Sequence, residues 1–281
     1  DAIFMNPPYQ APPKTEKNLN KANGVTIWPD FVKKALNDWL KDDGALGAIH
    51  PPGWRKPPSD KSKYRGLFKL LTQDNHMQFL SIHDSKEGQE TFNAGTRYDW
   101  YITKKGDSGS TLIRDQEKRN QTADLTKFDW LPNCNLDDVY ALIGKGGEII
   151  YNSYNYELRR KWVSTEKTKT HIYPLVHATN KKGNRFLYTS DNTKGHFGIP
   201  KVIFGQSGIN EPIIDFNGDY GMTECAMAIP IKNQKDGDKL KTYLMSDAFK
   251  IIRSSCLWGN FRVDWRMFKY FKKGFWRDDE K

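Results

Sequence analysis

The sequence has few cysteines and no apolar run long enough to cross a membrane. Its three cysteines, Cys134, Cys225 and Cys256, lie far apart and form no Cys-x-x-Cys pair. This pattern favours reduced thiols over a disulfide framework or a zinc site. No run of about eighteen apolar residues is present, and no basic segment followed by an apolar one opens the chain. We therefore expect a cytoplasmic protein of a bacterial or virus-infected cell.

Metal-ligand spacing is also absent. His171 and His177 enclose neither a carboxylate nor a cysteine, and the other histidines are scattered along the chain. Because metal sites need several nitrogen, sulfur or carboxylate ligands brought close together, we expect no bound metal.

Acidic residues are outnumbered by basic ones. The chain contains 44 Lys and Arg against 34 Asp and Glu, for a formal net charge of +10, and most of the excess follows residue 130. Lys and Arg side chains near phosphates release condensed counterions, so this balance favours a polyanionic partner for the second half. A solvated basic surface with no specific partner has the same composition.

The first part of the chain alternates between strand-like and helix-like patterns. Apolar positions predict strands at 1–5, 45–50, 79–83 and 99–104, and helices at 27–40 and 64–71. A loop is expected at 90–96, and the polar stretch 106–127 breaks the pattern. These segments predict part of an α/β sheet that closes with a hairpin, within a domain of residues 1–132.

After a boundary segment at 129–133 the patterns become shorter. Strands are predicted at 172–177, 185–189 and 200–204, and a helix at 240–252. We therefore predict a second, α+β domain of residues 133–281, which is the more basic of the two.

The first nine residues carry the most specific motif. Asp1 precedes a short apolar strand, which ends in Asn6-Pro7-Pro8-Tyr9. This order resembles motif IV of the S-adenosylmethionine-dependent amino-methyltransferases, in particular the N6-adenine DNA methyltransferases of restriction–modification systems. The resemblance implies a partial Rossmann-like methyltransferase sheet followed by a target-recognition domain. It also implies double-stranded DNA as the partner.

Adenine chemistry explains these residue types. The lone pair of an exocyclic amine is delocalised into the ring, and two acceptors around its hydrogens favour its localisation toward a methyl donor. The resemblance assigns these acceptors to the Asn6 side-chain oxygen and the Pro7 carbonyl. Pro7 and Pro8 stiffen the loop, and the resemblance implies that Tyr9 stacks on a flipped adenine. Phe92 is the nearest match to a second aromatic that the family often places against the base.

The second domain resembles the recognition domains of the same family more diffusely. Reading a DNA sequence requires Arg, Lys, Asn or Gln side chains that reach the edges of the bases. The candidates for base or phosphate contacts are Lys181, Lys182, Asn184, Arg185 and Lys201.

The donor-binding motifs of the family are missing from this sequence. They normally precede motif IV, whereas here nothing precedes Asp1, and the Phe-x-Gly-x-Gly pattern at 204–208 lacks the acidic residue expected before it. We interpret 204–208 as a turn, so the residues that bind S-adenosylmethionine are unknown. We expect a fragment with little independent methyl transfer, whose donor pocket comes from a missing N-terminal segment or a separate subunit.

Two other interpretations stay open. Asn-Pro-Pro-Tyr also occurs in methyltransferases that act on another planar nitrogen, either a protein glutamine amide or guanine N2 of RNA. The long basic region after the catalytic part counts against these enzymes. In the second interpretation, the chain is a non-catalytic remnant that only recognises DNA.

Overall fold

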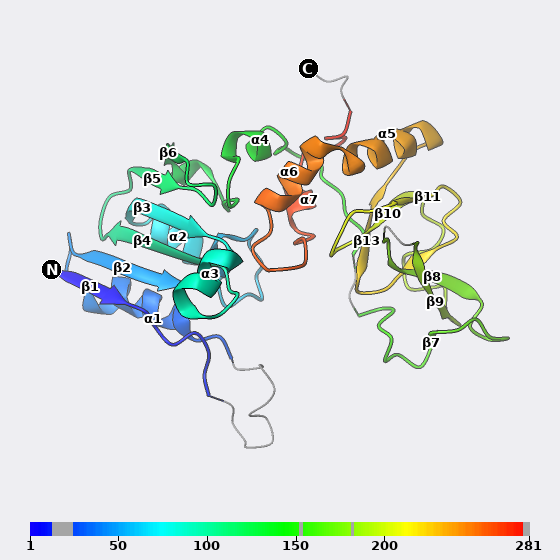
Figure 1. Cartoon of the computed structure of the whole chain (residues 1–281), viewed down its shortest axis with the longest axis horizontal. Coiled ribbons are helices and arrows are strands. Elements are labelled where there is room, and N and C mark those ends of the chain that lie inside the picture. The colour runs from blue at the N-terminus through cyan, green and yellow to red at the C-terminus, as the bar shows by residue number, and fades with distance from the viewer. Residues whose placement is uncertain (13–24, 152–153, 181–182, 278–281) are drawn as a thin grey trace. The chain divides into compact units, whose positions relative to one another are not determined.

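The computed structural model describes residues 1–12, 25–151, 154–180 and 183–277. The chain divides into two units (Figure 1). The first comprises Asp1–Leu136 with Trp258–Asn260, and the second comprises Asp137–Leu257 with Phe261–Lys281. The first unit thus extends past the predicted boundary at residue 132 and includes a short piece from late in the chain.

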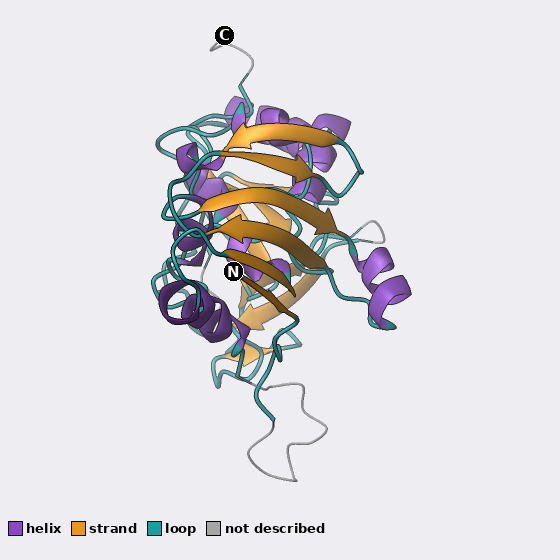
Figure 2. Cartoon of the chain, turned by 90° about the vertical axis from the view of Figure 1, so that its left-hand side faces the viewer, coloured by secondary structure: helices purple, strands orange, loops and turns teal. Residues whose placement is uncertain are grey.

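A six-stranded mixed sheet forms the centre of the first unit. Its strands are β1 (Ala2–Met5), β2 (Ala45–His50), β3 (His76–His83), β4 (Tyr98–Lys104), β5 (Ser110–Arg114) and β6 (Asn120–Asp124). They lie in the order β1-β2-β4-β3-β5-β6, and only the β1–β2 and β3–β5 pairs are parallel. Figure 2 shows the strands as one twisted layer. The predicted α/β sheet is confirmed.

Helical segments pack around this sheet. The helical segments are α1 (Trp28–Lys34), η2 (Ala35–Trp39), η3 (Pro52–Arg55), α2 (Leu67–Thr72), α3 (Ser85–Phe92), η4 (Leu125–Lys127) and α4 (Leu136–Tyr140). In Figure 1, α1 and α2 lie behind the sheet. Trp28 of α1 stacks on His50 at the end of β2, and Phe68 of α2 stacks on Trp54. These contacts bury the side chains that point to this face, and they form the core of the unit.

Two predictions for the first unit were wrong. Residues 90–92, predicted as loop, are the last turn of α3, which begins with a capping box between Asp84 and Glu87. The polar stretch 106–127 does not end the sheet, because β5 and β6 extend it as an antiparallel pair. Both segments are rich in polar residues, so their apolar pattern is weak.

A buried ion pair joins the segment after β2 to the start of β4. Arg55 and Asp99 are both fully buried, and the Arg55 Nε and Nη2 atoms donate to the two Asp99 carboxylate oxygens at 2.7 and 2.9 Å. The indole N–H of Trp54 donates to the same carboxylate at 2.8 Å. The Asp99 charge therefore has three donors in place of water.

The same guanidinium holds the end of the first unit. Arg55 donates to the carbonyl oxygens of Leu131 and Pro132 at 3.1 and 3.0 Å and to the Asn133 side chain at 3.0 Å. Trp258 donates from its indole to the Leu131 carbonyl at 2.9 Å. This last bond explains why the short 258–260 segment belongs to the first unit.

The second unit combines two small sheets with helices. Its strands are β7 (Val163–Ser164), β8 (Tyr173–Ala178), β9 (Arg185–Thr189), β10 (Lys201–Gly205), β11 (Ile213–Asp215), β12 (Gly221–Met222) and β13 (Ala226–Pro230). The sheets have the orders β11-β10-β13 and β12-β8-β9-β7. The α+β prediction for this region is confirmed.

The helices of the second unit differ from their prediction. The single helix predicted at 240–252 is two helices, α5 (Gln234–Met245) and α6 (Asp247–Ser255), followed by α7 (Met267–Tyr270). Ser246 separates α5 from α6, and its hydroxyl caps α6 by accepting from the Phe249 N–H. Phe249, Phe268 and Phe275 lie in one buried aromatic cluster.

The buried ion pair generates a prediction about stability. Asp99→Ala leaves the Arg55 charge buried without its partner, and we expect a loss of about 3–5 kcal/mol in the free energy of unfolding. Urea unfolding measures this value. Asp38→Ala removes an exposed ion pair with Lys34 in the same unit and serves as the control, for which we expect a much smaller change. Equal losses for the two variants would contradict the role given to Asp99.

Candidate functional site

The Asn6-Pro7-Pro8-Tyr9 segment begins where β1 ends. Pro7 and Pro8 have no backbone N–H, so the strand cannot continue through them. Because β1 runs parallel to β2, Asn6 lies at the edge of the sheet where β2 also ends. Pro7 is buried, whereas Asn6 and Pro8 are exposed. The segment is therefore anchored by one proline and presents Asn6 to solvent.

The two oxygens assigned by the motif are open acceptors. Within the described part of the chain, neither the Asn6 side-chain oxygen nor the Pro7 carbonyl accepts a hydrogen bond. Asn6 also lines a hollow of about 460 Å³ together with Phe4, Gly47 and Trp100. This volume lies in the range of small-molecule sites, roughly 300–1,000 Å³. Asn6 is thus exposed beside a space large enough for a ligand.

Tyr9 is half-buried at the end of the motif. Its backbone carbonyl accepts from the Ile27 N–H at 3.2 Å, and the Ala11 N–H donates to the Val25 carbonyl at 2.9 Å. These bonds fix the chain just after the motif. Burial raises the pKa of the Tyr9 phenol, so the ring is neutral at physiological pH.

The hollow is part of a larger apolar surface on the face of the sheet opposite α1 and α2. Phe4, Gly47, Ile102, Phe79 and Leu112 are paired in register across five neighbouring strands, so their positions lie on one face. Phe4 is 80% exposed and Leu112 is 42% exposed. A Cβ atom at Gly47 would lie 2.5 Å from the Phe4 ring, so only glycine permits this ring position. We call this row, with Trp100 beside it, the open face.

The open face was not predicted from the sequence. Trp100, which lies between the buried Asp99 and Tyr101, is 38% exposed. Alternation along a strand places Trp100 on the face opposite these two neighbours. The alternation along this strand could have shown that Trp100 lies on the face opposite Asp99 and Tyr101. The strand sequence alone does not show which of the two faces the helices cover.

His50 lies on the face of the sheet opposite the hollow and is a structural residue. It is fully buried, stacks on Trp28 with ring centroids 3.7 Å apart, and its Nε2 atom lies 2.8 Å from the Tyr101 hydroxyl. Burial lowers the pKa of His50 to about 3, so the ring is neutral. Its contacts position β2 and β4 under the hollow.

Phe92 lies at the same edge of the sheet as Asn6. It ends α3 and packs edge-on against Tyr98 at the start of β4, with ring centroids 4.9 Å apart. Tyr98 in turn stacks on His83 at 4.3 Å. Phe92 is half-buried, so part of its ring is available to a ligand. Its contact with a target base stays a prediction.

The candidate recognition residues have different surroundings. Arg185 begins β9 and is exposed, and Asn184 beside it is half-buried. Lys181 and Lys182 lie outside the described residues. Their roles in DNA binding stay predictions.

The prediction for Lys201 was wrong. Its side chain is fully buried in β10, and its Nζ atom lies 2.5 Å from Asp215 Oδ2. Desolvation by burial lowers the pKa of Lys201, although the Asp215 carboxylate opposes this change. A buried and paired ammonium cannot contact DNA, so Lys201 is a structural residue. Residues 201–205 form a continuous buried strand. The apolar residues that follow Lys201 in the sequence were the available signal that this lysine is buried.

The glycine pattern at 204–208, which we interpreted as a turn, comprises the end of β10 and the residues that leave it. Phe204 and Gly205 close β10, whose neighbours β11 and β13 are both antiparallel to it. The Gln206 N–H donates to the Cys225 carbonyl at 3.0 Å, and no helix follows in residues 206–212. A donor-binding turn leads from a parallel strand into a helix, which this segment does not do.

No group of three or more His, Cys, Asp or Glu side chains in the described residues could hold a metal ion. None of the helices in the described ranges has the length and apolar character needed to span a bilayer.

One solved restriction–modification enzyme shares the fold of this chain. No protein-family model matches the chain, and no curated protein matches its sequence. The type IIL restriction–modification enzyme MmeI in complex with DNA matches over 97% of this chain and 45% of that chain, with a TM-score of 0.53 and 9% identity. A modification subunit of a putative type I restriction enzyme from Vibrio vulnificus YJ016 matches over 43% of this chain and 27% of that chain, with a TM-score of 0.29 and 12% identity.

The MmeI similarity concerns the fold. It spans both units and confirms the predicted fold class, an α/β sheet followed by an α+β unit. The chain spans less than half of the length of either matched structure.

Proposed function

We propose that this chain is part of a site-specific DNA methyltransferase that transfers a methyl group from S-adenosylmethionine to N6 of a flipped adenine. The observation that carries the proposal is the position of Asn6-Pro7-Pro8-Tyr9. The motif directly follows β1 at the edge of a mixed sheet, and both of its assigned oxygens are free of hydrogen bonds in the described residues. The shared fold with a restriction–modification enzyme supports this proposal.

The motif residues act on the adenine amine. The Asn6 side-chain oxygen and the Pro7 carbonyl accept from the two amine hydrogens and draw the lone pair out of the ring. Because the prolines hold both acceptors in advance, little reorganisation is needed when the base arrives. Tyr9 provides a ring face for the extruded base. S-adenosylmethionine supplies the electrophilic methyl group.

The residues around the hollow form only part of a donor site. Among the described side chains that line it, the polar groups are the Asn6 amide and the Trp100 indole N–H, because the Tyr101 hydroxyl lies on the opposite face of the sheet, bonded to His50. They do not provide the set of polar contacts that the donor's ribose and carboxylate require. In this proposal, a preceding segment of the protein or a separate subunit supplies the rest of the donor pocket.

The open face supports this part of the proposal. Phe4, Trp100 and Leu112 are large apolar side chains left partly in water, and such a patch usually marks a contact surface. In addition, β1 pairs only with β2 among the described strands, so its other edge can accept a further strand. Polypeptide that carries the donor site would cover this face and pair with this edge.

DNA is the proposed partner of the second unit. The basic excess after residue 130 and the exposed Arg185 support this assignment. A binding assay with duplex DNA across a salt series separates it from methyl transfer to protein, because a protein substrate requires no salt-dependent affinity for DNA.

Asn6→Ala tests the catalytic assignment. In protein that includes the donor-binding polypeptide, we expect this change to reduce methyl transfer to duplex DNA at least about a hundredfold, because one of two preorganised acceptors is lost. Duplex affinity should stay nearly unchanged, since Asn6 acts on the reacting amine. Gln10→Ala, an exposed change just past the motif, is the control and should retain activity. Full activity in Asn6→Ala would refute the proposal.

Tyr9 tests base stacking separately. Tyr9→Ala removes the ring and should lower methyl transfer by about tenfold or more, because stacking on an aromatic ring contributes about 1–3 kcal/mol per base. Tyr9→Phe keeps the ring and should retain most of the activity. Transfer rates for the two variants under identical conditions give the comparison. Similar losses in both variants would show that the hydroxyl, and not the ring face, is required.

A further inference from the structure

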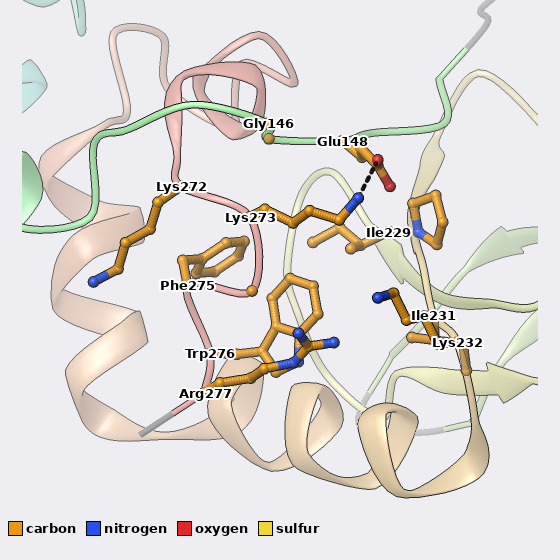
Figure 3. Close-up of a pocket in the computed structure, with 13 residues that line it drawn as sticks. Gly146, Glu148, Ile229, Ile231, Lys232, Lys272, Lys273, Phe275, Trp276 and Arg277 are labelled. Atoms are coloured by element: carbon orange, nitrogen blue, oxygen red, sulfur yellow. Dashed lines mark hydrogen bonds and ion pairs between the residues drawn. The ribbon is translucent and has the colours of Figure 1, made fainter. Parts of the chain in front are cut away.

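The second unit has a small basic pocket that the proposed chemistry does not use. It lies between the turn at Gly146 and Gly147, the residues that follow β13, and the segment 272–277 (Figure 3). A Cβ atom at Gly147 would lie 2.2 Å from the Phe268 carbonyl oxygen, so only glycine allows the turn to pack directly against α7. The pocket is therefore built by close backbone packing.

Three cationic groups surround the opening. Lys273 pairs with Glu148 at 3.1 Å, and Arg277 donates to Asp236 at 2.8 Å. Lys232 is exposed and has no ion-pair partner among the residues that the structure describes. In Figure 3 the Lys232 amine and the Arg277 guanidinium point toward one another, whereas Lys272 points away. The pocket thus carries an excess of positive charge.

The Arg277 side chain is held in position at the pocket by two contacts. Its guanidinium carbon lies 5.6 Å from the centre of the Trp276 ring, and one of its terminal nitrogens is bonded to Asp236. A guanidinium has five N–H donors, so others remain for an acceptor. An arginine fixed in this way loses little side-chain entropy when it binds a phosphate.

The size of the pocket selects the kind of ligand. Its cavity volume is about 80 Å³. This volume is well below that of typical small-molecule sites, roughly 300–1,000 Å³, so the pocket suits a small group such as a phosphate.

We propose that this pocket binds one backbone phosphate of DNA, through Lys232 and Arg277 with Lys273 beside them. The inference rests on the DNA binding proposed above and adds a specific contact to it. Phosphate contacts fix the register of a protein on the duplex and carry no sequence information themselves. The pocket therefore orients the second unit on DNA.

Salt dependence of duplex binding by the full 281-residue chain tests this proposal. Lys232→Gln should lower the slope of log affinity against log salt by about 0.9, because one phosphate contact is lost. Lys232→Arg keeps the charge and should keep the slope. Lys235→Gln removes an exposed charge that does not line the pocket, and it should also leave the slope unchanged. Thermal unfolding of each variant checks that the fold is intact.

The outcomes separate this inference from the proposed function. If the unaltered chain binds DNA with strong salt dependence and Lys232→Gln keeps the same slope, the pocket assignment is wrong and DNA binding stands. If the unaltered chain has no salt-dependent affinity, the proposed function fails and this inference with it. Calorimetry with inorganic phosphate distinguishes a site for a free anion from a site for a DNA phosphate. Phosphate binding that Lys232→Gln abolishes, with an unchanged slope for DNA, would assign the pocket to a free anion.

Discussion

The buried ion pair between Arg55 and Asp99 is the constraint on which the first unit depends. It joins the segment after β2, the start of β4 and the carbonyls at 131–132 into one arrangement. Charges removed from water tolerate few other geometries, because any shift leaves one of them without its partner. The Asn6-Pro7-Pro8 segment leaves the sheet at the same edge. A rigid frame therefore carries the loop, which is what catalysis by preorganised acceptors requires.

The two faces of the sheet are unequal, and this difference links structure to function. One face is closed by α1 and α2, whereas the other keeps Phe4, Trp100 and Leu112 partly exposed. The hollow beside Asn6 is bounded by the same Phe4 and Trp100. Covering the open face and completing the donor pocket are therefore one event in our proposal. Burial of the apolar row would supply the binding free energy, and the same contact would bring donor-binding groups to Asn6.

Part of this fold could be predicted from apolar periodicity, namely β1, β2 and β4 of the first unit and β8, β9 and β10 of the second. Periodicity failed where burial is slight. The edge strand β6 has the polar sequence Asn-Gln-Thr-Ala-Asp. The helix α3 is also largely polar, but Asp84 and Glu87 have the spacing of a capping box, which could have predicted its start. Lys201 was misjudged because its partner Asp215 lies on another strand, and sequence alone does not pair them. The motif at Asn6 could be found because its chemistry depends on adjacent residues, whereas the open face depends on the packing of distant elements.

In our proposal, these residues hold the acceptors for the adenine amine but only part of the donor site. Calorimetric titration of the purified 281-residue chain with S-adenosylmethionine tests this claim most directly. We predict no binding at micromolar concentrations, because in the described part of the chain the Asn6 amide and the Trp100 indole N–H are the only polar side-chain groups that face the hollow. A micromolar dissociation constant for the chain alone would contradict the account.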